Sequence, residues 1–188
     1  EVIDEITEAY SNFEFSKFFQ IIQNFCVVDL SNFYLDIAKD RLYVSCKSDF
    51  RRRSCQTVLS LIIEKISGLI APVLCHMAED IWQNIPYKLE EDSVFQRGWP
   101  ISPESWRNSN FNCHVIQLRK LRSVINRMLE SCRNNRDLGS SLEASVRVDI
   151  ADEKVQAAIE WLAQSESNNV DLLRDWLLVS SLQIGGEP

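Results

Sequence analysis

The sequence from residue 118 to residue 148 reads LRKLRSVINRMLESCRNNRDLGSSLEASVRV, and its hydrophobic period changes within this stretch. Before Gly139 the apolar side chains recur at helical spacing, which predicts one face of an amphipathic helix: Leu118, Leu121, Ile125, Met128, Leu129 and Cys132. After Gly139 apolar and polar residues alternate, which predicts a strand over residues 144–150. Gly139 is expected to end the helix or the turn that follows it. The stretch therefore predicts a helical part followed by a part that contains both helix and strand.

Helices are also predicted upstream of this stretch. The first carries an aromatic stripe at helical spacing and has Asn12 as its candidate cap: Phe15, Phe18, Phe19, Ile22 and Phe25. Phenylalanine on one helical face is usually core, so we expect these rings to be buried; a base-stacking platform is the alternative. A second helix is expected to start at Ser31 and to continue through Leu42.

A proline separates the next two predicted helices. Ser48 or Asp49 is the candidate start of the third helix, whose apolar positions again follow the helical period. Pro72 cannot continue a ladder of backbone hydrogen bonds, so we expect a kink or break near Ala71. A further helix is expected at about residues 73–85.

The remaining segments are shorter. Residues 86–110 have little periodicity and are expected to form a crossover loop that aromatic side chains hold in place. Asp152 is the candidate cap of a short helix, and Asn168 or Asn169 is the candidate start of another. Residues 179–184 are a second strand candidate, which is expected to share a small sheet with residues 144–150.

Composition supports a mainly α, globular chain. Of 188 residues, 45% are hydrophobic and 25% are charged, and five glycines and five prolines are few for an all-β fold. We predict a helical bundle at residues 1–138 and a small α+β subdomain at residues 139–188. No apolar run is long enough to suggest a membrane span. The first residues, EVIDE, have no signal-peptide pattern and are typical of a helix that starts upstream.

Six cysteines are spread along the chain without a C-x-x-C pair: Cys26, Cys46, Cys55, Cys75, Cys113 and Cys132. A zinc site needs ligands clustered at short spacings, and the two histidines are also far apart in the sequence. We therefore expect no metal site. Each cysteine lies in or beside an apolar helical stretch, which favours small buried hydrophobes in a reducing compartment.

Positive charge is concentrated in two segments of an acidic chain. The net charge is −7, yet residues 39–53 carry a net charge of +4 and residues 117–136 carry +5, which leaves −16 for the remainder. Guanidinium groups match phosphate oxygens in pairs, so two arginine-rich segments favour phosphate binding. Helical spacing places four basic side chains away from the apolar stripe of the second segment: Arg119, Lys120, Arg127 and Arg133.

Five blocks of the sequence match one family in order. Residues 25–43 read FCVVDLSNFYLDIAKDRLY, and residues 51–59 read RRRSCQTVL. Matches continue at residues 69–86, LIAPVLCHMAEDIWQNIP, at residues 118–148, quoted above, and at residues 171–184, DLLRDWLLVSSLQI. These blocks resemble bacterial-type isoleucyl-tRNA synthetases, and the resemblance covers essentially the whole chain. The first block is specific for the isoleucine enzyme, whereas the AEDIW segment alone fits the valine, leucine and methionine relatives too.

The resemblance implies the anticodon-binding bundle of a class I synthetase, with a small α+β subdomain after it. It also implies a catalytic domain upstream in the same polypeptide, which uses ATP and Mg and carries signatures of the HIGH and KMSKS type. Neither those signatures nor another catalytic motif is present in this sequence, so we expect no catalytic residue and no cofactor here. In bacterial relatives a zinc module can follow this region. The implied partner is isoleucine tRNA, in a monomeric enzyme of the bacterial cytoplasm or of an organelle of bacterial descent.

The candidate tRNA-binding residues are basic side chains of the two segments within the matching blocks: Lys39, Arg41, Arg51, Arg52, Arg53, Arg119, Lys120, Arg127 and Arg133. The arginines at 51–53 and the basic residues at 119, 120 and 127 are expected to contact phosphates, while other side chains read bases. In the alternative, one or two of the arginines at 51–53 pair with Asp36, Asp40 or Asp49 inside the bundle. For the whole chain, the alternatives are the equivalent domain of a valine or leucine enzyme and a helical protein-interaction module.

Overall fold

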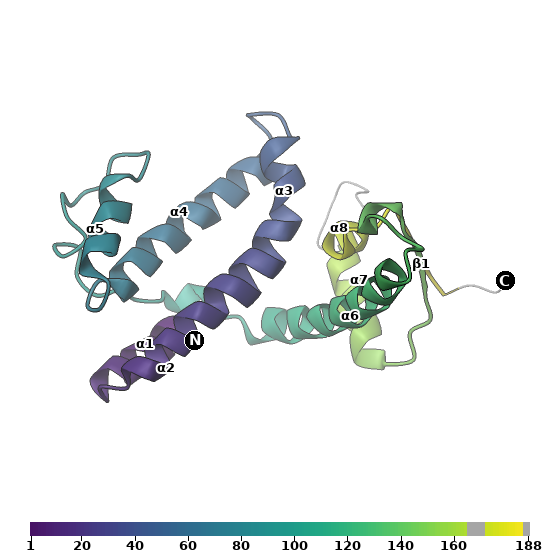
Figure 1. The fold of residues 1–188 in the computed structure, drawn as a ribbon, viewed down its shortest axis with the longest axis horizontal. Coiled ribbons are helices and arrows are strands. Elements are labelled where there is room, and N and C mark those ends of the chain that lie inside the picture. The colour runs from purple at the N-terminus through teal and green to yellow at the C-terminus, as the bar shows by residue number, and fades with distance from the viewer. Residues whose placement is uncertain (165–171, 186–188) are drawn as a thin grey trace. The chain divides into compact units, whose positions relative to one another are not determined.

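The computed structural model describes residues 1–164 and 172–185. Its contacts divide the chain into two compact units, Glu1–Trp106 and Arg107–Pro188 (Figure 1). Helices dominate both units, and one small sheet lies in the second, so the predicted mainly α fold with a small α+β part is confirmed. The sequence places its domain division after residue 138, where the hydrophobic period changes. The contacts divide the chain earlier, because the helix before that position packs with the α+β elements.

The first unit begins with a short helix and a long one. Helix α1 spans Val2–Ser11, and the long helix consists of α2, Phe15–Asn24, a π-helical segment η1, Phe25–Leu35, and α3, Asp36–Tyr43. The predicted cap and the predicted second start are both wrong. Asn12 ends α1 and Glu14 precedes α2, while the helix continues through Ser31 because the backbone stays helical at both ends of η1.

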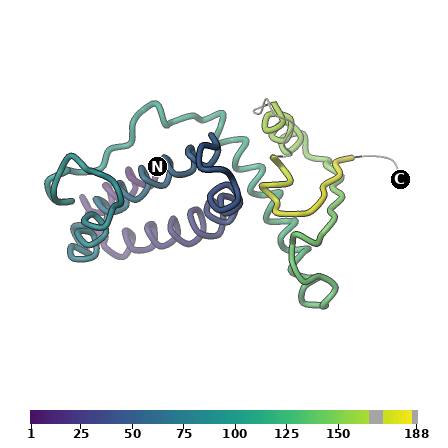
Figure 2. Tube along the Cα trace, turned by 90° about the horizontal axis from the view of Figure 1, so that it is seen from above, coloured from purple at the N-terminus to yellow at the C-terminus, as the bar shows by residue number. Residues whose placement is uncertain are grey.

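Helix α4 runs alongside the long helix and returns the chain (Figures 1 and 2). It spans Phe50–Ile70, and the Asp49 carboxylate caps it by accepting from the Arg52 backbone N–H at 3.1 Å. The helix ends directly before Ala71 and Pro72, so the predicted break is confirmed. Helix α5 follows at Cys75–Gln83, within the predicted range of residues 73–85.

The core of the first unit lies where α1, α2, α5 and the end of α4 meet. Its buried side chains include Ile6, Phe18, Ile22, Leu69 and Trp82. The Tyr10 hydroxyl donates to the Leu69 carbonyl at 3.0 Å and so ties α1 to α4. Only part of the aromatic stripe is core: its members Phe18 and Ile22 are buried and Phe25 is half-buried, but Phe15 and Phe19 are exposed, contrary to the prediction.

A crossover segment follows α5 and contains the short 3-10 helix η2, Glu104–Trp106. The Trp99 indole N–H donates to the Thr7 hydroxyl at 2.9 Å, and its ring meets the Tyr10 ring edge-on. Pro100 is buried against Gly68, where an added Cβ would lie 2.6 Å from the proline Cγ. The predicted loop held by aromatic side chains is therefore confirmed, and Gly68 is needed for close contact of the loop with α4.

The second unit is built on α6, Ser109–Asn134, which Asn108 caps. Leu118, Ile125 and Leu129 are buried, as predicted, against α7 and α8. Met128 and Cys132 are exposed, although their spacing placed them on the same face. That face instead buries Arg122, whose guanidinium donates to the Trp176 carbonyl at 2.6 Å.

The predicted sheet is confirmed, with shorter strands. After the 3-10 helix η3, Ser141–Glu143, strand β1, Ser145–Val148, pairs in parallel with β2, Ser181–Ile184, so that Ser145 lies opposite Ser181. Helices α7, Glu153–Gln164, and α8, Leu172–Leu177, lie between the strands in the chain. The Asp152 carboxylate accepts from the Lys154 N–H at 2.9 Å, as expected of a cap. The predicted start at Asn168 or Asn169 lies outside the described residues.

The cysteines are less buried than predicted. Cys55 is buried and Cys26 is half-buried, but the other four are exposed: Cys46, Cys75, Cys113 and Cys132. Two of these lie at helix ends or loops, where an apolar neighbour in sequence does not imply burial. Across the part of the chain that the structure describes, no cluster of three metal-ligating side chains is found. None of the helices in the described part of the chain could span a membrane.

Candidate nucleic-acid interface

The loop of residues 44–49 joins α3 to α4 and lies within the first basic segment. Its backbone is held by local hydrogen bonds: the Ser45 N–H donates to the Asp40 carbonyl at 3.3 Å, and the Asp49 N–H donates to the Cys46 carbonyl at 3.0 Å. The Arg52 guanidinium reaches back from α4 and donates to the Ser45 carbonyl at 2.9 Å. The chain between the two helices is therefore a defined turn that presents its side chains from a fixed backbone.

The five candidate residues of this segment differ in exposure and in the partners of their side chains. Lys39 is exposed and forms an ion pair with Asp36 at 3.0 Å. Arg41, Arg51 and Arg52 are half-buried, and Arg53 is exposed on the first turn of α4. Arg52 serves the fold, as the alternative proposed for one or two of the arginines at 51–53. Its side chain donates to the Ser45 backbone carbonyl, however, and not to an aspartate. All five lie on α3 and the start of α4, which contact one another.

The second basic segment lies on α6, in the second unit. Lys120 and Arg127 are exposed, whereas Arg119 is half-buried. Arg133 is exposed, pairs with Glu130 at 3.0 Å and also donates to the Ser141 hydroxyl. Between Lys120 and Arg127 the same face carries exposed Val124, so this side of α6 is less polar than the sequence suggested. The structure brings these four residues onto one helix, and each basic segment stands within its own unit.

Two exposed aromatic side chains within the first basic segment escaped the sequence analysis. Tyr43 ends α3 and is 83% exposed, and Phe50 begins α4 and is 82% exposed. Neither residue belongs to a clear apolar stripe, because both lie at the ends of their helices, next to the loop of residues 44–49. Their position on either side of a short polar, basic loop could have identified them.

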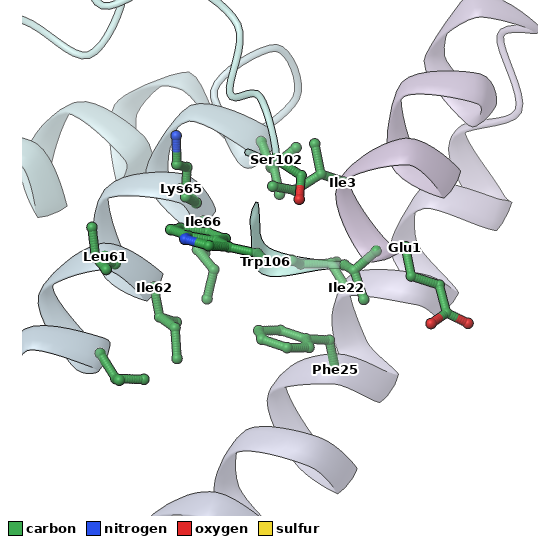
Figure 3. A pocket seen from close by; sticks show the side chains of 13 residues that line it. Glu1, Ile3, Ile22, Phe25, Leu61, Ile62, Lys65, Ile66, Ser102 and Trp106 are labelled. Atoms are coloured by element: carbon green, nitrogen blue, oxygen red, sulfur yellow. The ribbon is translucent and has the colours of Figure 1, made fainter. Parts of the chain in front are cut away.

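An apolar cavity of about 430 Å³ lies between α1, α2 and α4 in the first unit. Figure 3 shows Ile22 and Phe25 facing Ile62 and Ile66 across it, with Trp106 between them. Lys65, Ser102 and Glu1 contribute polar groups to its lining. Partial burial, and then the charge of Arg97, lower the pKa of Lys65. The lining offers apolar contact rather than a paired acid and base.

A second, polar cavity of about 460 Å³ lies beside the crossover segment. Glu64 accepts from Arg97 at 2.9 Å and from the Tyr87 hydroxyl at 3.0 Å, and the Arg97 guanidinium lies over the Trp82 ring at 5.7 Å. Burial and then the bond to Glu64 raise the pKa of Tyr87. These groups satisfy one another and fasten the loop to α4 and α5, which is a structural task.

Comparison with known proteins gives a family match that crosses the boundary between the two units. The model of a family described as the anticodon-binding domain of tRNA ligase matches residues 1–148. A protein named isoleucine-tRNA ligase from Prochlorococcus marinus strain NATL1A is 89% identical over the whole chain, and one from strain NATL2A is 88% identical. Another of that name, from Parasynechococcus marenigrum strain WH8102, is 63% identical over the same 188 residues. The chain spans 19% of the length of each of these relatives.

Proposed function

We propose that this chain, which belongs to the family of anticodon-binding domains of tRNA ligases, docks the anticodon arm of isoleucine tRNA for an isoleucine-tRNA ligase. Identity of 89% to a protein of that name supports isoleucine over the valine and leucine alternatives. The catalytic domain of the same polypeptide, with ATP and Mg, would then perform aminoacylation. We expect the whole enzyme to be a monomer in the cytoplasm.

The observation that carries this proposal is the placement of positive charge. Arg53, Lys120 and Arg127 are exposed, and no ion pair holds them within the described part of their units. The chain as a whole is acidic, so RNA is repelled from most of its surface and attracted to these residues. Arginine and lysine that contact phosphates fix the position of the RNA without reading its sequence.

Charge removal tests the proposal. The affinity of the chain for a stem-loop RNA with the isoleucine anticodon would be measured across salt concentrations for the unchanged chain and for Arg53→Gln, Lys120→Gln and Arg127→Gln. Each lost phosphate contact should flatten the log–log salt dependence by roughly one unit and weaken binding. Lys17→Gln is the matched control, because Lys17 is exposed but pairs with Glu14 at 3.2 Å on an acidic turn. If all four variants keep the affinity and the salt slope of the unchanged chain, the basic-residue interface is refuted.

A helical protein-interaction module remains the second candidate for the basic residues. An acidic protein partner would also bind more weakly in high salt, so salt alone does not separate it from RNA. Competition between tRNAs does, because an interface for the isoleucine anticodon distinguishes cognate from non-cognate tRNA, whereas a surface for an acidic protein is blocked equally by both. Activation of isoleucine belongs to the catalytic domain in this proposal. The isolated chain should therefore show no isoleucine-dependent pyrophosphate exchange.

A further inference from the structure

Tyr43 and Phe50 are the two most exposed large hydrophobic side chains among the described residues, at 83% and 82%. They stand at the two ends of the loop of residues 44–49, and Val44 beside Tyr43 is 79% exposed. Single exposed apolar residues are ordinary, but three at one turn form a local apolar surface. The loop backbone is held by Arg52 and Asp49, so these side chains project from a fixed turn.

The surroundings of this apolar turn are basic. Lys47 lies in the loop and is exposed, and Arg53 is exposed three residues after Phe50. The one acidic residue in the loop, Asp49, is occupied as the cap of α4. Aromatic rings beside cationic side chains are what unpaired nucleotides bind, because bases stack on the rings while phosphates meet the cations. A partner that is apolar alone would gain nothing from the positive charge.

We infer that Tyr43 and Phe50 stack on unpaired bases of an RNA loop, while the neighbouring cations hold its backbone. The inference rests on the proposed function and deepens it by separating base contacts from phosphate contacts. It assigns base contact to two residues outside the nine basic candidates. It also gives Arg52 a positioning task, since its bond to the Ser45 carbonyl fixes the turn between the two rings.

Phe13 provides the matched control. It is 79% exposed, close to the value for Tyr43 and Phe50, and it lies in the turn before the other end of the long helix, roughly 40 Å away at about 1.5 Å per residue. Its turn is acidic, with Glu14 beside it and Glu8 on the preceding helix. If removing a ring weakened RNA binding only through lost apolar surface, Phe13→Ala would weaken it as much as the other two alanine variants.

The experiment compares Tyr43→Ala, Phe50→Ala, Phe13→Ala and the conservative Tyr43→Phe in the full chain. Affinity would be measured for a stem-loop RNA with the isoleucine anticodon and for a duplex of the same stem. A photo-crosslinking base, 5-iodouridine, would replace each loop nucleotide in turn, and mass spectrometry would locate the crosslinked residue. Circular dichroism melting checks that the variants fold, which we expect because the substituted side chains are exposed.

Tyr43→Ala and Phe50→Ala should each weaken stem-loop binding by about 5- to 100-fold, with the salt slope and duplex affinity unchanged. Tyr43→Phe and Phe13→Ala should bind as the unchanged chain does, and loop crosslinks should map to residues 43 and 50. Normal affinity in both alanine variants with an intact salt slope would overturn the stacking inference and leave the proposed function standing. Equal losses for stem-loop and duplex would also overturn it. If the unchanged chain shows no salt-dependent stem-loop binding, the proposed function itself fails.

Discussion

Neighbouring arginines at the start of α4 have different surroundings, although the sequence presents them as one run. Arg52 donates to the Ser45 carbonyl from a half-buried position, whereas Arg53 is exposed. Sequence alone could not separate them, because the bond of Arg52 depends on how the loop of residues 44–49 folds back. The exposed Tyr43 and Phe50 escaped sequence analysis for the same reason, since exposure is a property of the folded turn.

Arg52→Gln should therefore lower the free energy of unfolding by about 1 kcal/mol, because the Ser45 carbonyl loses a charged donor. Arg53→Gln should leave unfolding unchanged within about 0.5 kcal/mol and should weaken RNA binding instead. Urea unfolding and RNA titration of both variants check this pair of outcomes. The assignment is wrong if Arg53→Gln is the destabilising change of the two.

Tyr10 links α1 to α4 through a hydroxyl that must stay protonated to donate. Burial raises the pKa of Tyr10 from 10.0 to about 12. Its contribution to stability is therefore fully present below pH 10 and is lost as the pH rises towards 12. Between pH 10 and pH 12, the Tyr10→Phe variant should lose less of its neutral-pH stability than the unchanged chain loses. Thermal melts at stepped alkaline pH measure it, and identical losses in both proteins would contradict the role of Tyr10.

At the scale of elements, hydrophobic period identified most helices and both strands. It misread the long helix as two, because Ser31 is a common cap residue and η1 accommodates it within a continuous helix. It also extended the buried face of α6 to Met128 and Cys132, which are exposed, and did not include Arg122, which is buried. Whether a position on a helix is covered depends on the partner that packs there, which the period does not specify.

Arg122 serves the packing of α6 in the second unit. It is 6% exposed and its guanidinium donates to the Trp176 carbonyl at 2.6 Å. Arg122→Gln should lower the free energy of unfolding by about 2 kcal/mol, since the half-buried Trp176 carbonyl loses a charged donor. Lys120→Gln, two residues earlier and exposed, is the control and should change it by less than about 0.5 kcal/mol. Urea unfolding followed by circular dichroism distinguishes them, and equal effects would disprove the structural role of Arg122.

At the scale of the whole molecule, the resemblance to isoleucyl-tRNA synthetases and the family comparison agree. The fold class could be predicted because helical and strand periods follow from local burial. The interface could be predicted only as two charged segments, Lys39–Arg53 and 117–136, since sequence places charge along the chain and not in space. Both segments remain candidates for phosphate contact, one in each unit.

The proposed function requires this acidic chain to recognise the anticodon arm of isoleucine tRNA. The most direct measurement is competition, in which unlabelled isoleucine tRNA or valine tRNA displaces a labelled isoleucine anticodon stem-loop from the chain at physiological salt. We expect isoleucine tRNA to displace the stem-loop at lower concentration than valine tRNA does. Equal displacement by the two tRNAs, or no displacement by either, would contradict it.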